Sequence, residues 1–214
     1  MANIPAEMVK RLRDETGAGM MDSKRALTDS DGDFDKAKDW LRVKGLARAA
    51  DKASRATKEG VIDAYIHHSS GIAKQGALVE VDCESDFVAK TDDFKQLAHS
   101  LALQVVGAAP LYVRREEVPA ELVEREKAVY RDQVAGKPEN IVEKILEGKL
   151  NDFYSKICLL EQPWIKDDKK RVRDLVTEAV AKLGENITVA RFARFEVGDT
   201  AGDGPAVADI KPSA

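Results

Sequence analysis

This 214-residue chain has only two cysteines, no long apolar run and no large excess of one charge. The two cysteines, Cys83 and Cys158, match no C-x-x-C pattern, so neither a disulfide framework nor a zinc site is indicated. The chain contains no run of about 18 apolar residues, the length that a membrane-spanning helix needs. Met1–Pro5 lacks the basic segment and apolar run of a secretory leader, so we expect a cytoplasmic protein without a membrane partner.

Motifs of nucleotide-hydrolysing and metal-dependent enzymes are missing too. Gly17–Ala18–Gly19 is not followed by the lysine of a phosphate-binding G-x-x-x-x-G-K-[ST] loop. The three histidines, at positions 67, 68 and 99, have no H-E-x-x-H or comparable ligand spacing. With a formal net charge of -4, direct nucleic-acid binding is not expected either. These absences predict a protein with no catalytic residues, no cofactor and no metal.

A thiolate–imidazole pair of Cys83 and His99 is the enzymatic alternative. It requires the helix after residue 87 to fold back over the strand that carries Cys83. Cys83 shares the alternation of Val79 and Val81, which predicts a small buried core residue. The pattern therefore favours a structural role for Cys83.

Three short helices are predicted over residues 5–45. The first ends at Gly17, because glycine readily adopts the backbone of a turn. Asp22 is expected to cap the second helix and Asp33 the third, which ends at Gly45. A unit of this size has a very small core, so we interpret it as a docking module and not as a catalytic body.

Residues 46–59 are predicted to form a linker, helical in part. Basic side chains alternate with alanines there, and little apolar patterning anchors them to a core. A solvated surface explains this charge, with RNA binding by an interaction module as the alternative.

Strand-like runs then follow. Residues 61–67 and 76–83 predict an antiparallel hairpin, and 187–197 predict a third strand. After the second strand, apolar residues at helical spacing predict a helix that ends near Gly107.

Two further helices, 119–135 and 138–159, each begin at a proline and are separated by Gly136, which predicts an antiparallel helical hairpin. A last helix is expected to begin at Asp167–Asp168 and to end at Gly184.

These elements predict an α+β fold: a small three-stranded antiparallel sheet packed with helices, preceded by the three-helix module. The predicted domains are the docking module 1–45, the linker 46–59, a core domain 60–198 that includes the helical hairpin, and a disordered tail 199–214. A small sheet with open edges also favours dimerisation through the core.

An acidic residue followed by a large aromatic one stands at the exit of the second strand, in Ser85–Asp86–Phe87–Val88. Taken alone, this pattern is typical of helix capping. Ser85 or Asp86 would cap the next helix, and Phe87 would pack onto the core.

Three stretches together resemble the bacterial elongation factor Ts family, over residues 5–198. They are LRDETGAGMMDSKRAL at 12–27, VDCESDFVA at 81–89, and GENI with RFARFE within 184–196. The resemblance implies a guanine-nucleotide exchange factor and not a bond-making enzyme. Such a factor binds the GDP complex of elongation factor Tu, displaces Mg²⁺ and promotes GDP release so that GTP can bind.

The resemblance assigns the N-terminal helices to a ubiquitin-associated-like (UBA-like) module that docks on the GTPase. The partner-binding positions that it implies are Arg13, Gly17, Gly19, Met20 and Met21. Methionines beside a glycine turn suit such a contact, because their side chains are apolar and adaptable.

The resemblance also gives Ser85, Asp86, Phe87 and Val88 a second interpretation. It implies that these residues push in beside the magnesium site of the GTPase and dislodge Mg²⁺, which is an electrostatic anchor of the diphosphate. Ser85 stands where the family usually has threonine, and it keeps the hydroxyl group.

One core is present here, whereas longer family members carry a second, repeated one. The resemblance therefore implies a homodimer through the sheet, in which His68 contributes contacts from the second subunit. Ala193 stands where some relatives have cysteine, which rules out a covalent dimer bond at that position.

Overall fold

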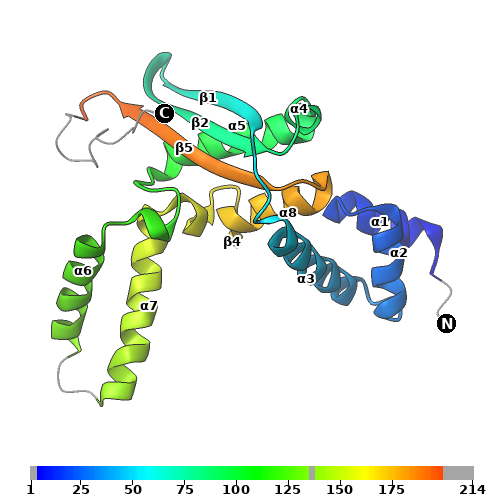
Figure 1. Ribbon diagram of the computed structural model, residues 1–214, viewed down its shortest axis with the longest axis horizontal. Helices are drawn as coiled ribbons and strands as arrows, with labels where there is room; N and C mark the ends of the chain where they lie inside the picture. Colours follow the sequence, from blue (N-terminus) through cyan, green and yellow to red (C-terminus); the bar gives the residue numbers. More distant parts are fainter. Residues whose placement is uncertain (1–3, 135–137, 200–214) are drawn as a thin grey trace. The chain divides into compact units, whose positions relative to one another are not determined.

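The computed structural model describes residues 4–134 and 138–199 (Figure 1). They divide into two compact units. The first contains the chain up to Val61, 81–97 and 174–188, and the second contains 62–80, 98–173 and the chain from Val189. Gly136 and the predicted tail from residue 200 lie outside the described residues.

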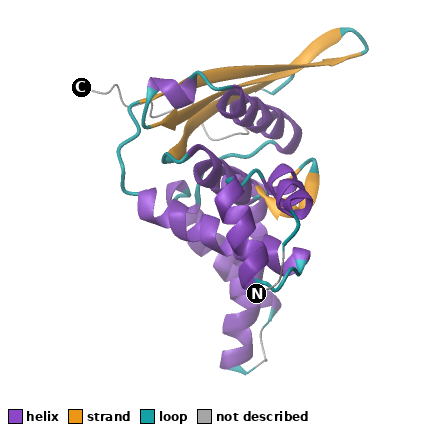
Figure 2. Ribbon diagram, turned by 90° about the vertical axis from the view of Figure 1, so that its right-hand side faces the viewer, coloured by secondary structure: helices purple, strands orange, loops and turns teal. Residues whose placement is uncertain are grey.

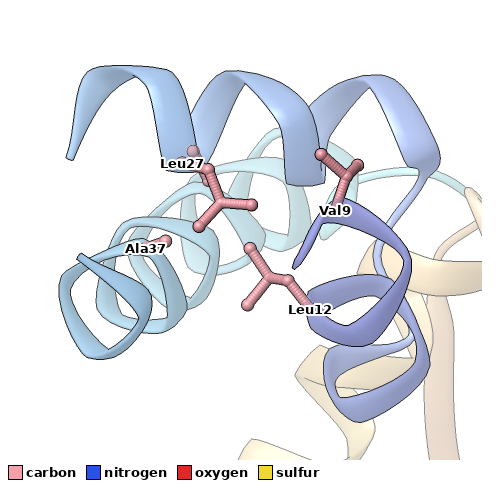
Figure 3. Close-up of a cluster of buried hydrophobic side chains, with 5 residues drawn as sticks. Val9, Leu12, Leu27 and Ala37 are labelled. Atoms are coloured by element: carbon pink, nitrogen blue, oxygen red, sulfur yellow. The ribbon is translucent and has the colours of Figure 1, made fainter. Parts of the chain in front are cut away.

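The N-terminal helices of the first unit are α1 (Ala6–Thr16), α2 (Met20–Asp29) and α3 (Phe34–Lys52). Figure 3 shows how their apolar side chains converge on a small core formed by Val9, Leu12, Ala26, Leu27 and Ala37. Gly17 ends α1 with φ 68°, a left-handed conformation that a side chain disfavours. The predicted helix end at Gly17 is confirmed.

Two caps of these helices were predicted, and one prediction is wrong. The Asp33 side chain accepts hydrogen bonds from the backbone N–H groups of Asp35 and Lys36, so Asp33 caps α3 as expected. Gly19 occupies the N-cap of α2, and Asp22 lies in its first turn. Asp22 fails as a cap because α2 begins three residues earlier than its position requires.

Gly45 does not end α3, which continues to Lys52. Gly45 is buried, and a Cβ atom there would lie 3.4 Å from the Cβ of Ala181. The glycine therefore serves close packing against another helix, and the alanine-rich segment after it keeps helical geometry. Residues 46–52 of the predicted linker are helical.

The sheet has the strand order β1–β2–β5, with β1 at Glu59–Ser69, β2 at Ile72–Cys83 and β5 at Ile187–Glu196. Val197 N donates to Lys74 O, Gln75 contacts Glu196 and Glu80 contacts Arg191, so β5 runs antiparallel to β2. The predicted three strands are confirmed. β1 and β2 extend beyond the predicted bounds.

The helix expected after β2 is divided into α4 (Asp86–Ala89) and α5 (Asp92–Ala108). Figure 2 shows α5 along one face of the sheet. The buried side chains of Leu101 and Val105 on α5 and of Ala77 and Val79 on β2 belong to the core there.

The predicted helical hairpin is present as α6 (Ala120–Gln133) and α7 (Glu139–Ile157), which lie side by side in Figure 1. Pro119 and Pro138 occupy the two N-caps. Short 3-10 turns, η1 (Arg115–Glu117) and η2 (Leu159–Glu161), stand before α6 and after α7.

The prediction that a helix begins at Asp167–Asp168 is wrong. Asp167–Arg171 forms β4, which pairs with β3 (Pro163–Trp164), and α8 spans Val172–Leu183. The two aspartates resemble a helix start, but the backbone there forms a small antiparallel ribbon instead. The predicted helix end at Gly184 is confirmed.

One buried carboxylate joins several elements of the second unit. Glu161 of η2 accepts hydrogen bonds from Arg115 at 2.7 Å, Arg171 at 2.8 Å and Arg173 at 3.2 Å. Burial raises the pKa of Glu161, but the hydrogen bond from Arg115 and the positive charges of Arg173 and Arg171 outweigh it, so the pKa lies below its usual 4.5.

Replacing Glu161 by alanine should lower the free energy of unfolding by about 3 kcal/mol, because three arginines lose their shared partner.

A group whose pKa is lower in the folded state adds stability above its unfolded pKa and loses it as pH falls through the folded value. Urea unfolding of the wild type should therefore show a loss of stability below about pH 4.5 that is smaller in Glu161→Gln. Glu124→Gln, which removes an exposed ion pair with Lys127, is the control. Equal pH profiles in the wild type and Glu161→Gln would contradict this role.

Candidate functional site

A single exposed aromatic ring marks the exit of β2. Phe87 lies on the one-turn helix α4 and is 81% exposed. Ala89, two residues later, is buried, and two residues correspond to about 200° around a helix, so Phe87 stands on the opposite face. The alternative in which Phe87 packs onto the core is wrong.

Ser85 provides the cap that the sequence predicted. It is the N-cap of α4, and its hydroxyl accepts from the backbone N–H of Val88 at 3.5 Å. The strand backbone and this cap together fix the direction in which the short turn leaves the sheet. Val88 itself is half-buried.

The carboxylate of Asp86 lies next to Phe87 and is held in its charged form. Lys90 donates a hydrogen bond to it at 2.5 Å and adds a positive charge, and both lower the pKa of Asp86. An apolar ring and an ionised carboxylate thus stand side by side on the surface.

The second group of implied partner contacts lies at the junction of α1 and α2. Met21 is 75% exposed and Met20 is 46% exposed, both directly after the N-cap Gly19. Arg13 is also exposed, and its backbone oxygen accepts from Gly17 N at 2.7 Å. These residues and α4 belong to the same compact unit.

Asp22 braces this junction against α3. Lys44 donates to its carboxylate at 2.6 Å and Arg48 pairs with it at 2.8 Å. The hydrogen bond from Lys44 leads the contributions that lower the pKa of Asp22. Met20 and Met21 therefore lie in the first turn of α2, which the ion pairs of Asp22 hold against α3.

One surface of the sheet is apolar and exposed. Alternation places Ile62 and Ile66 on one face of β1, and Ile66 lies over Gly76, whose added Cβ would meet the Ile66 side chain at 2.7 Å. Alternation in β2 places Gly76, Leu78 and Glu80 on one face. Arg191 of β5 pairs with Glu80, and Phe195 lies on the same face of β5 as Arg191. We call this surface the open sheet face, formed by Ile62, Ile66, Leu78 and Phe195, all exposed. His68 is exposed on the same alternation of β1.

The Cys83–His99 pair is not formed. Cys83 is fully buried, as its alternation predicted, and burial raises the pKa of its thiol, with a further contribution from Glu185. His99 contacts Asp63 at 3.1 Å and the ring of Tyr65. A buried, protonated thiol without a histidine partner is a poor nucleophile.

Neither a metal-binding cluster nor a membrane-spanning helix is present among the described residues. Within 4–134 and 138–199, no set of three or more His, Cys, Asp or Glu side chains gathers in a way that could hold a metal ion. Across the same ranges, no helix combines the length and apolarity needed to span a bilayer.

Sequence reasoning missed Glu185 and Asn186, in the turn between α8 and β5. Glu185 accepts hydrogen bonds from Ser85, directly before the exposed ring, and Asn186 donates to the backbone after α3. The signal was present in the Gly184–Glu185–Asn186 motif, but its contacts are about 100 and 130 residues away in the chain.

An exposed aromatic turn and an exposed methionine pair are features typical of the class of partner-binding proteins. The model of the family described as elongation factor TS matches residues 46–199. Elongation factor Ts of Thermotoga maritima is 55% identical over 196 residues, covering 92% of this chain and 97% of the relative. That of Oleidesulfovibrio alaskensis is 56% identical over 200 residues, covering 92% and 100%, and that of Heliobacterium modesticaldum is 56% identical over 198 residues, covering 92% and 91%. The chain belongs to the elongation factor Ts family.

Proposed function

We propose that this protein is the guanine-nucleotide exchange factor of elongation factor Tu. It binds the GDP complex of the GTPase, displaces Mg²⁺ and promotes GDP release so that GTP can bind. The observation that carries the proposal is the 81% exposure of Phe87 on a capped turn beside the ionised Asp86. An exposed aromatic with no intramolecular packing role is suited to burial in a partner.

In this proposal the factor acts on the magnesium ion that is bound with GDP in the GTPase. The ion bridges phosphate oxygens and offsets their negative charge, so its displacement weakens GDP binding. In the proposed complex Phe87 wedges in beside the ion, and Asp86 adds negative charge near the diphosphate. Ser85 and Val88 hold the turn that carries both groups. No bond is made or broken, so the protein acts through binding energy alone.

Magnitudes require more than one contact. Burying Phe87 contributes about 1.5–3 kcal/mol, and each tenfold in rate needs about 1.4 kcal/mol. The wedge therefore accounts for about one to two powers of ten. Further binding energy comes from the docking module, residues 1–45, through Arg13, Met20 and Met21 on the turn between Gly17 and Gly19.

Linkage imposes a reciprocal effect. If this protein weakens GDP binding to the GTPase, GDP must weaken the binding of this protein by the same factor. Entry of GTP then drives the factor off, which completes one exchange.

The direct test is the release of a fluorescent GDP analogue from purified elongation factor Tu. We expect a large acceleration by catalytic amounts of this protein, with no nucleotide hydrolysed. Salt-sensitive binding to RNA without any effect on nucleotide release would instead support the RNA-binding alternative.

We also propose a homodimer through the open sheet face, with His68 contributing contacts from the second subunit. Exposed apolar side chains on a three-stranded sheet favour burial against a second copy. Sedimentation at micromolar concentration should show a dimer. Phe195→Asp should raise its dissociation constant at least about 100-fold, because a carboxylate would be buried without a partner. Leu111→Asp, at an exposed site off the sheet, is the control. A wild type that sediments as a monomer would exclude the dimer.

A further inference from the structure

The turn between α8 and β5 binds the strand exit that carries the proposed wedge. The carboxylate of Glu185 accepts hydrogen bonds from the backbone N–H groups of Glu84 at 3.1 Å and Ser85 at 3.0 Å. Its other oxygen accepts from the Ser85 hydroxyl at 2.5 Å. One side chain thus holds two consecutive peptide groups and the cap of α4.

The same turn binds the end of α3, the last of the N-terminal helices, and the segment that follows it. Asn186 is buried, and its side-chain amide donates to Arg55 O at 2.8 Å and to Ala53 O at 3.4 Å. Lys52, the last residue of α3, donates to Gly184 O at 2.5 Å. The end of α3 and the segment after it are therefore held to the turn by two side chains, those of Lys52 and Asn186, each of which donates to backbone oxygens.

Glu84 completes the connection. Its carboxylate accepts from Asn186 N at 2.6 Å and pairs with Arg55 at 3.5 Å. Glu84 and Glu185 each bind the backbone of the other's segment, so the two segments are joined twice. We call these contacts among 52–55, 84–85 and 184–186 the acid clamp.

The acid clamp matters because α4 itself is held only by its Ser85 cap and by the few contacts of one turn, which include the buried Ala89. α4 has a single turn, which is too short to be stable as an isolated helix. Phe87 is exposed, so its position depends on the backbone that carries it. That backbone is anchored at Ser85, where Glu185 takes up both N–H and O–H groups.

We infer that Glu185 is a positioning residue for nucleotide exchange, one that aims Phe87 relative to the docking helices. This inference rests on the proposed function. Energy from docking at Met20 and Met21 can drive the wedge into the partner only if the two contacts keep a fixed geometry. Glu185 supplies the contact on the wedge side of that joint.

The test measures GDP release from elongation factor Tu at increasing concentrations of the full-length factor. Glu185→Ala should lower the maximal rate about tenfold, because a displaced wedge loses alignment. The half-saturating concentration should stay within about twofold, since the docking module is intact. Glu185→Gln keeps the size and one acceptor oxygen and should show a smaller loss of rate. Asp93→Asn, which changes an exposed acid paired with Lys182 in the same unit, is the matched control.

Two further measurements separate positioning from general stability. In the Phe87→Ala background, Glu185→Ala should have no additional effect on the maximal rate, because it acts through the missing ring. Amide hydrogen exchange of Glu84 and Ser85 should accelerate in Glu185→Gln, while the amides of α2 keep their wild-type rates.

The possible failures are distinguishable. A normal maximal rate in Glu185→Ala together with a loss in Phe87→Ala overturns the positioning role and leaves the wedge intact. Additive losses in the double variant also overturn it, because Glu185 then acts independently of the ring. A normal rate in Phe87→Ala overturns the proposed wedge and this inference with it.

Discussion

Replacing Phe87 by alanine is expected to lower the maximal rate of GDP release about 10- to 100-fold. The ring contributes about 1.5–3 kcal/mol when it is buried, and this energy is used only as the wedge enters the partner. The variant should fold normally, because Phe87 makes no buried contact of its own chain. Stopped-flow release of a fluorescent GDP analogue at saturating factor measures the effect.

Controls for Phe87→Ala must show that exposure alone does not create the effect. Leu111 is also a large exposed apolar residue, and it lies outside both proposed contacts. Leu111→Ala should keep the wild-type rate, and the melting temperatures of both variants should match the wild type. If Phe87→Ala accelerates GDP release as well as the wild type does, the turn is only a capped helix start.

The double variant Met20→Ala, Met21→Ala is expected to raise the half-saturating concentration about 30-fold and to leave the maximal rate nearly unchanged. Each methionine offers about 1 kcal/mol or slightly more on burial, given its partial exposure in the free protein. This contact is made on docking and persists through release, so its loss weakens binding uniformly. Titration of the factor against a fixed amount of GTPase separates the two quantities.

Arg25→Ala is the control for the methionine variant, because Arg25 is an exposed residue of the same helix that pairs only with Asp29 among the described contacts. It should leave both the half-saturating concentration and the maximal rate unchanged. A fall in the maximal rate of the methionine variant at unchanged half-saturation would contradict a docking role. The Phe87 variant is expected to change the maximal rate, and the methionine variant the half-saturating concentration. The two sites can therefore be tested independently.

Local patterns in the sequence were sufficient for most helices and strands of the fold. The left-handed end of α1 at Gly17, the Asp33 cap and the alternation in β2 each depend on a few neighbouring residues. The predictions were wrong where contacts with residues distant in the sequence determine the backbone conformation. Gly45 reads as a helix end, but it is retained in α3 because Ala181 approaches it closely. Asp167–Arg171 carries no apolar alternation, and its strand forms through pairing with β3.

The candidate site was predictable as a motif but not in its geometry. Ser85 was correctly interpreted as a cap, whereas the direction of Phe87 depends on which side of α4 the core lies. The sequence could not show that Ala89 takes the buried side. The contacts of Glu185 could not be predicted from local sequence patterns, because its hydrogen bonds with Glu84 and Ser85 join residues about 100 positions apart.

Magnesium dependence tests the wedge most directly. GDP release should be measured for the wild type and Phe87→Ala, at saturating factor, from millimolar Mg²⁺ down to full chelation. If the ring acts by displacing the ion, the rate ratio between the two proteins should be large at millimolar Mg²⁺ and fall toward one as the ion is removed. A ratio that stays constant over the whole range would show that Phe87 promotes release without acting on the metal.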